Sequence, residues 1–228
     1  MTIWEYFSEP RPWFNTENYT HEQIIMFFIG SVLWLVCYAD VLIGVVRNKV
    51  LHIPIAAVLL NFGWEIAASL FFVPDMGKLI VIAYCAWMFF DLFIFLSLFK
   101  YGFKQVQVPY FRKHLPFFLI LGIVISFFSQ LTFMLDYDIP MAPISGYIIN
   151  LIMSVAFLYL LYIPNYPNSK VAAWSKFLGT GIISVMFYTK YPQDYFLLSM
   201  YISVAIFDIL YIYHLMRRKS EISSQWTA

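Results

Sequence analysis

Long apolar runs dominate the sequence and decide what the chain can fold into. Each is close to the roughly 20 residues that a helix needs to cross the hydrocarbon core of a bilayer. Only 12% of the 228 residues are charged, whereas about a quarter of a soluble domain is charged. We therefore predict an integral membrane protein with helical spans at residues 21–45, 52–73, 78–99, 114–135, 142–163, 172–189 and 195–215.

The distribution of lysine and arginine predicts the orientation of these helices. The loops after the first, third and fifth spans and the end of the chain carry most of the basic residues, whereas the opposite side carries only Arg11, Lys78 and Lys190. Because positively charged loops stay in the cytoplasm, the N-terminus should lie outside or in a lumen and the C-terminus in the cytoplasm. We expect an all-α bundle of seven transmembrane helices whose neighbours run antiparallel.

A single membrane domain accounts for nearly the whole sequence. We interpret residues 1–20 as an interfacial aromatic segment, 21–215 as the seven-helix domain and 216–228 as a basic cytoplasmic tail. A net charge of +1 without a basic cluster argues against a nucleic-acid partner. The expected surroundings are a lipid bilayer, and no obligate protein partner is evident. A bacterial source would place the protein in the cytoplasmic membrane, and a fungal source in the endoplasmic reticulum.

Acidic residues inside the spans are the strongest indication of function. There are four of them, Asp40, Glu65, Asp91 and Asp208. A charged group at the centre of a bilayer costs a few kcal/mol and usually marks function. We find no lysine or arginine at comparable depth, so we expect protonated carboxyls or hydrogen bonds to neutral partners. Candidate partners include Asn61, which lies one helical turn from Glu65, and also Tyr38 and Asn150.

The surroundings of the four acids differ. Asp40 lies near a helix end, so we interpret it as a structural or interfacial carboxyl. Asp91 could be either a residue that forms hydrogen bonds between helices or a residue that lines a cavity. At ~1.5 Å per residue, Glu65 lies in the outer half of its span and Asp208 roughly 20 Å from the outer end of the last span. We expect the acids to face one another across a cavity, with Tyr211 within reach of Asp208.

Several kinds of site are missing from the sequence. No Asp-Asp-x-x-Asp cluster is present to bind magnesium and a diphosphate, because the pair Asp136 and Asp138 has the wrong spacing. No group of histidines or cysteines has the spacing of metal ligands, and no glycine-rich phosphate loop occurs. We predict neither a metal nor a cofactor.

Four short motifs occur in order along the second, third, sixth and seventh spans. They are Asn61-x-x-Trp64-Glu65, Trp87-x-x-x-Asp91, Trp174-x-x-x-x-Gly179-Thr180 and Asp208-x-x-Tyr211. In this order and on seven spans, the chain resembles the small transmembrane terpene cyclases of fungal meroterpenoid and indole-diterpene pathways, which have bacterial relatives. The similarity covers the whole chain in architecture, although about ten positions carry it.

The resemblance implies an activity and a set of site residues. The substrate would be a lipophilic isoprenoid with a farnesyl-type chain, cyclised by protonation of a terminal epoxide or alkene without loss of diphosphate. Two acids, by motif Glu65 and Asp208, would be catalytic. One would deliver the proton, and the other would stabilise positive charge or accept the final proton. The remaining predicted substrate-binding residues are Asn61, Trp64, Trp87, Asp91 and Tyr211.

Two other functions fit a bundle with deep acids. A seven-helix, proton-coupled transporter of a small metabolite would also place carboxyls in the membrane. Such transporters usually contain internal repeats or helices broken near the midplane, and we see no repeat here. A receptor-like or purely structural bundle is the third interpretation.

Overall fold

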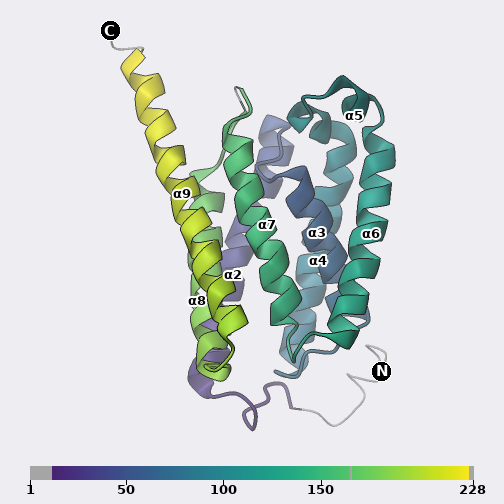
Figure 1. Cartoon of the computed structure of the whole chain (residues 1–228), viewed down its shortest axis with the longest axis vertical. Coiled ribbons are helices and arrows are strands. Elements are labelled where there is room, and N and C mark those ends of the chain that lie inside the picture. The colour runs from purple at the N-terminus through teal and green to yellow at the C-terminus, as the bar shows by residue number, and fades with distance from the viewer. Residues whose placement is uncertain (1–11, 165, 226–228) are drawn as a thin grey trace.

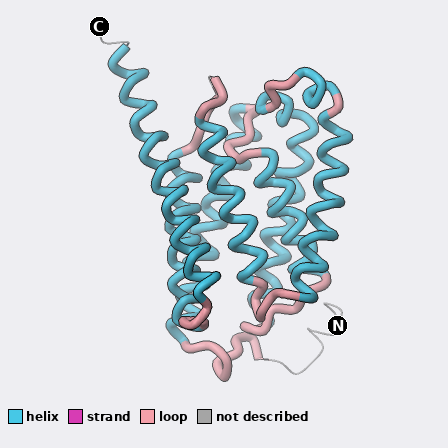
Figure 2. Tube along the Cα trace, in the orientation of Figure 1, coloured by secondary structure: helices cyan, strands magenta, loops and turns pink. Residues whose placement is uncertain are grey.

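The computed structural model describes residues 12–164 and 166–225, which form a helical bundle (Figures 1 and 2). This part of the chain contains eight α-helices and no strand, so the predicted all-α fold is confirmed. The helices are α2 (His21–Ile43), α3 (Ile55–Leu70), α4 (Lys78–Tyr101), α5 (Pro109–Lys113), α6 (Leu115–Asp136), α7 (Pro143–Leu161), α8 (Lys170–Lys190) and α9 (Tyr195–Gln225).

Six helices are long and apolar enough to cross a membrane, namely α2, α4, α6, α7, α8 and α9. Large apolar side chains on their outer faces, such as Phe28, Phe117 and Ile206, are more than half exposed, as expected of surfaces that contact lipid. Helix α3 has 16 residues, which is about 24 Å of helix and less than the ~30 Å of a hydrocarbon core. The prediction of seven spans is therefore confirmed for six helices.

The ends of the chain differ from the predicted boundaries. Helix α9 continues past residue 215 as far as Gln225, so the described part of the predicted tail 216–228 is helical. This stretch contains neither proline nor glycine, and its basic residues are good helix formers. Residues 1–11 of the predicted N-terminal segment lie outside the described residues.

Close contacts between helices hold the bundle together. Helix α2 packs along α8, α7 along α9, and α3 along α4, α6 and α7. At the α2–α8 crossing, a Cβ on Gly30 would lie 2.9 Å from the backbone oxygen of Gly179. Small residues allow such an approach between membrane helices. In Figure 1, α2 begins at the lower end of the bundle and α9 ends beyond the upper end.

A polar contact ties the upper loops together near the start of α3. The side-chain nitrogen of Gln105 donates to the carbonyl of Ile53 at 2.8 Å and to the hydroxyl of Tyr166 at 2.9 Å. Its side-chain oxygen accepts from the backbone N–H of Ile55 at 3.0 Å. The Tyr166 hydroxyl in turn donates to the carbonyl of Leu51 at 2.6 Å. These bonds fix where α3 enters the bundle.

Candidate active site

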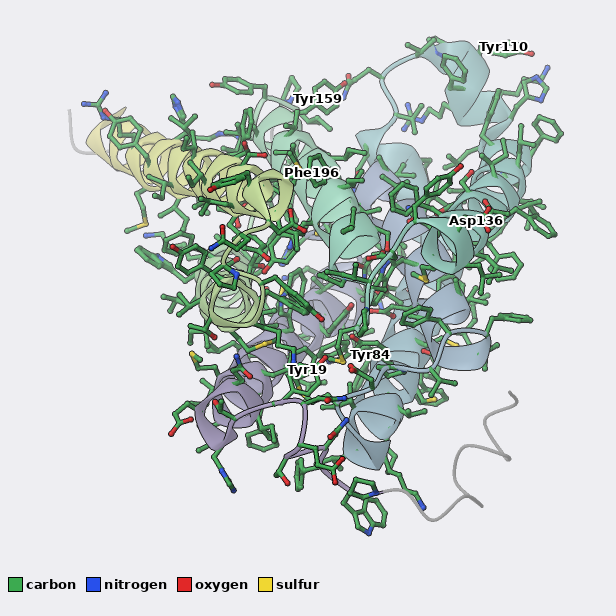
Figure 3. The ribbon with its side chains drawn as sticks, turned by 60° about the horizontal axis from the view of Figure 1, so that its bottom comes forward. Tyr19, Tyr84, Tyr110, Asp136, Tyr159 and Phe196 are labelled. Carbon is green, nitrogen blue, oxygen red and sulfur yellow. The ribbon has the colours of Figure 1, made fainter. Side chains whose placement is uncertain are left out.

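A cavity of about 110 Å³ lies inside the bundle. Residues of α2, α3, α4, α7 and α8, together with the loop before α7, line it, whereas α6 and α9 contribute no lining residue. Figure 3 shows Tyr84, one of the lining residues, in the interior of the bundle, and Tyr159 at its periphery. Four of the predicted site residues line the cavity: Asn61, Trp64, Glu65 and Trp87.

Glu65 is held by neutral hydrogen-bond donors from two helices. The Tyr38 hydroxyl donates to Glu65 Oε1 at 2.5 Å, and Asn61 Nδ2 donates to the same oxygen at 3.0 Å. Asn61 and Glu65 are four residues apart on α3, so their side chains share one face of the helix. Glu65 is buried, with 2% of its surface exposed. This one-turn relationship is confirmed as the sequence predicts it.

The third member of this cluster is Asp91 of α4. Asn61 Nδ2 lies 2.7 Å from Asp91 Oδ2 and also 2.7 Å from the hydroxyl oxygen of Tyr38. An amide nitrogen carries two hydrogens, one fewer than the three oxygens of Glu65, Asp91 and Tyr38 around Asn61 Nδ2, so Asn61 cannot donate to all three at once. Asp91 does not line the cavity but contacts its wall through Asn61.

Two carboxyl oxygens in the cluster lack a hydrogen-bond partner. They are Glu65 Oε2 and Asp91 Oδ1, both buried. Among the described residues, no lysine or arginine forms an ion pair with either acid. A buried polar atom left without a partner costs about 1–3 kcal/mol. Glu65 thus lines the cavity as a buried acid whose second oxygen, Oε2, accepts no hydrogen bond from a donor among the described residues.

Aromatic rings cover much of the cavity wall beside the acids. Tyr84 stacks on Trp87 at 5.6 Å between ring centroids and meets Trp64 edge to face at 5.4 Å. The Phe27 ring lies 6.4 Å from that of Trp87, and the Trp34 ring lies 6.1 Å from that of Tyr38. The faces of such rings attract cations. The wall can therefore stabilise positive charge without supplying a competing base.

The start of α7 positions Trp64. The Asp138 carboxylate accepts from the backbone N–H groups of Ile144 and Ser145, both at 2.9 Å, and from the Ser145 hydroxyl. Ser145 Oγ accepts from the indole N–H of Trp64 at 2.8 Å. Just before α7, Ala142 lines the cavity with a φ of 51°, in the left-handed region that non-glycine residues rarely adopt. Asp138 thus holds a tight loop against the cavity.

Asp208 lies outside the cavity, and its partner contradicts a prediction made from the sequence. Lys176 Nζ lies 2.7 and 2.8 Å from its two carboxylate oxygens, and the pair is almost fully buried. The same ammonium donates to the Ser154 hydroxyl at 2.8 Å. The expectation that no basic residue reaches the depth of the acids is therefore wrong. Lys176 is inside the predicted span 172–189, and that position was the available signal.

Two further expectations, for Asp208 and Tyr211 of α9, fail, and Trp174 and Asp40 also lie away from the cavity. Asp208 and Glu65 do not meet across the cavity, since no residue of α9 lines it. Tyr211 packs against Phe157 and donates to Asn168 at 3.4 Å, so it lines no part of the cavity. Trp174 is 43% exposed on the outside of α8. Asp40 lies 3.7 Å from a ring nitrogen of His52 near the end of α2.

The geometry supports acid chemistry in a largely aromatic site. A buried carboxyl without a basic partner keeps its proton more readily than one in water. These features fit the protonation of a lipophilic molecule.

Comparison with known proteins identifies a family for the chain. The family model of Pyr4-like transmembrane terpene cyclases matches residues 12–219, which is nearly the whole chain. No curated protein and no solved structure matches the chain. The match includes every element that surrounds the cavity. The chain therefore belongs to the Pyr4-like transmembrane terpene cyclases and is a multi-pass membrane enzyme that cyclises terpenes.

Proposed function

We propose that this cyclase acts on a farnesyl-type chain of a meroterpenoid precursor and starts the reaction by protonating a terminal epoxide or alkene. The observation that carries the proposal is Glu65, a buried acid that lines an aromatic cavity and has an unpartnered oxygen, Oε2. Diphosphate would not leave, and no metal is needed to ionise the substrate. The product would be an isomer of the substrate.

We assign proton donation to Glu65 rather than to Asp208. Asp208 is ion-paired with Lys176 and lines no part of the cavity, so it does not meet a substrate there. Glu65 and Asp91 share the Asn61 amide without a basic partner, and two carboxylates side by side in an apolar interior would repel each other. At least one of the two therefore carries a proton. Because the two sites interact, the proton belongs to the pair as a whole.

The reaction balances with this pair alone. Glu65 transfers its proton to the epoxide oxygen or the terminal alkene carbon, and the neighbouring alkene attacks the resulting electron-poor carbon to close a ring. Aromatic faces such as those of Trp64, Trp87 and Tyr84 stabilise the cation that migrates along the chain. Loss of a proton from the last cation to the carboxylate pair forms the final alkene and restores the acid.

Asp208 takes a positioning role in this proposal. Ser154 follows Met153, which lines the cavity, and Lys176 lies one helical turn from Thr180, which also lines it. The ion pair therefore fixes α8 and α9 against α7 directly beside the cavity wall. The proposal also has seven helices, α3 included, cross the membrane, with the C-terminus in the cytoplasm. The short helix α3 would then be held in place by neighbouring helices rather than by lipid.

Product formation by purified protein tests the proposal. Detergent-solubilised wild type, incubated with farnesyl-bearing and epoxyfarnesyl-bearing aromatic compounds, should yield an isomer of unchanged mass and new retention time. Glu65→Gln should form none, whereas the matched control Asp40→Asn should react normally because Asp40 does not line the cavity. A transporter would change no substrate in detergent, since transport needs two compartments. Failure of wild type to isomerise any of these compounds would contradict the proposal.

A further inference from the structure

The cavity has a second polar wall that the proposed reaction does not use. It lies on α7 and α8, where Asn150 and Thr180 line the same cavity as Glu65. Asn150 Nδ2 donates to Thr180 Oγ1 at 3.2 Å. Two helices other than those that carry the acids therefore supply this wall.

Asn150 Oδ1 is buried and has no hydrogen-bond partner. The Tyr147 hydroxyl of this wall is paired: it lies 2.8 Å from Ser184 Oγ. The Ser184 hydroxyl in turn donates to the Thr180 carbonyl at 2.8 Å. An unpaired buried amide oxygen costs about 1–3 kcal/mol. In a binding site, a ligand that supplies a donor recovers this cost.

We propose that Asn150 binds a hydrogen-bond donor on the substrate, so that the cavity selects prenyl chains that carry a hydroxyl, phenol or N–H group. This inference rests on the proposed function, because it takes a prenyl chain as the ligand. The donor would lie at the wall of α7 and α8 while the reacting end of the chain meets Glu65. Asn150 thereby sets which end of the chain faces the acid.

Binding of two simple probes separates this role from catalysis. Farnesol carries a hydroxyl at the end opposite its terminal alkene, and farnesyl methyl ether has the same chain without a donor. Trp34, Trp64 and Trp87 line the cavity, so ligand entry should quench tryptophan fluorescence. The variant Gly146→Leu, which places a larger side chain at the cavity wall, measures the quenching that does not depend on ligand entry. The nearest neighbour of a Cβ at Gly146 would be the Trp64 ring at 3.6 Å, which is ordinary van der Waals contact, and Gly146 itself lines the cavity.

Farnesol should bind wild type about tenfold more tightly than the ether, the usual effect of one buried hydrogen bond. In Asn150→Leu, both probes should bind with the affinity that the ether has for wild type, which also shows that the variant is folded. Glu65→Gln should keep the tenfold preference, although Glu65 also has an oxygen without a partner.

Three results would overturn the inference. Equal binding of both probes to wild type would mean that no protein group accepts from the hydroxyl. A preference that survives in Asn150→Leu but disappears in Glu65→Gln would place the hydroxyl at the acid cluster. Absence of saturable quenching would overturn both this inference and the proposed function. A preference that depends on Asn150, in a protein that isomerises no substrate, would support the inference while contradicting the proposed reaction.

Discussion

Lys176 Nζ lies 2.7 Å from Oδ1 and 2.8 Å from Oδ2 of Asp208, and both side chains are almost completely buried. The ion pair joins α8 to α9, and Ser154 adds α7 through its hydroxyl at 2.8 Å. This contact separates the two acids that the family resemblance groups together. One is a carboxylate with a fixed cationic partner, and the other is a carboxyl among neutral groups.

Breaking this ion pair on one side should destabilise the protein strongly. Lys176→Met leaves the Asp208 carboxylate buried without a counter-charge, which costs about 3–5 kcal/mol. The double variant Lys176→Met with Asp208→Leu should recover most of this loss because no charge remains buried. Thermal unfolding in detergent measures both effects. A single variant as stable as wild type would show that the pair does not fix these helices.

A methyl group at the crossing of α2 and α8 should also destabilise the bundle. In Gly30→Ala the new Cβ would lie 2.5 Å from a side-chain carbon of Ile183 and 2.9 Å from the Gly179 carbonyl oxygen. Overpacking of this kind costs about 1–3 kcal/mol.

Gly181→Ala is the matched control in α8, because a Cβ there meets nothing within 4 Å. It should be neutral or stabilising by up to about 1 kcal/mol, since alanine favours a helix over glycine. Equal melting temperatures for the two variants would contradict the close packing of α2 on α8.

The hydrogen bonds of Tyr166 to Leu51 and Gln105 should make the stability of the fold depend on pH in the alkaline range. Burial raises the pKa of Tyr166 from 10.0 to about 12. A group whose pKa is raised in the folded state stabilises the fold below its unfolded pKa and loses that contribution as pH rises through the folded pKa. Stability should therefore fall between pH 10 and about 12.

Tyr166→Phe tests this assignment. The variant should lose about 1–3 kcal/mol at neutral pH because Leu51 and Gln105 lose a partner. It should then show a shallower fall in stability at alkaline pH than wild type, measured by thermal unfolding. Parallel falls in the two proteins would assign the dependence to other groups.

The sequence predicts those parts of the site that depend on one helix at a time. Asn61 and Glu65 are four residues apart, so their shared face follows from helical geometry alone. The membrane environment of Glu65 follows from the length and apolarity of the surrounding runs. These two arguments account for why the strongest sequence candidate does line the cavity.

The remaining parts depend on how helices are rotated against each other, which no single run of sequence specifies. Asp91 reaches Asn61 because α4 packs beside α3, and Asp208 faces Lys176 because α9 packs on α8. Periodicity places these residues on a helix but leaves its rotation open. The spacing of the motif Asp208-x-x-Tyr211 likewise gave no indication that Tyr211 turns to Asn168.

The central claim is that Glu65 gives the initiating proton, and a comparison of cyclisation rates tests it most directly. The rate of product formation under saturating substrate should be measured for wild type, Glu65→Gln and Asp208→Asn, with folding checked by thermal unfolding. Glu65→Gln should fold normally and lose about 10²–10⁴ in rate, the usual contribution of a general acid. Asp208→Asn should lose activity together with stability. A Glu65→Gln enzyme that cyclises at the wild-type rate would contradict the account.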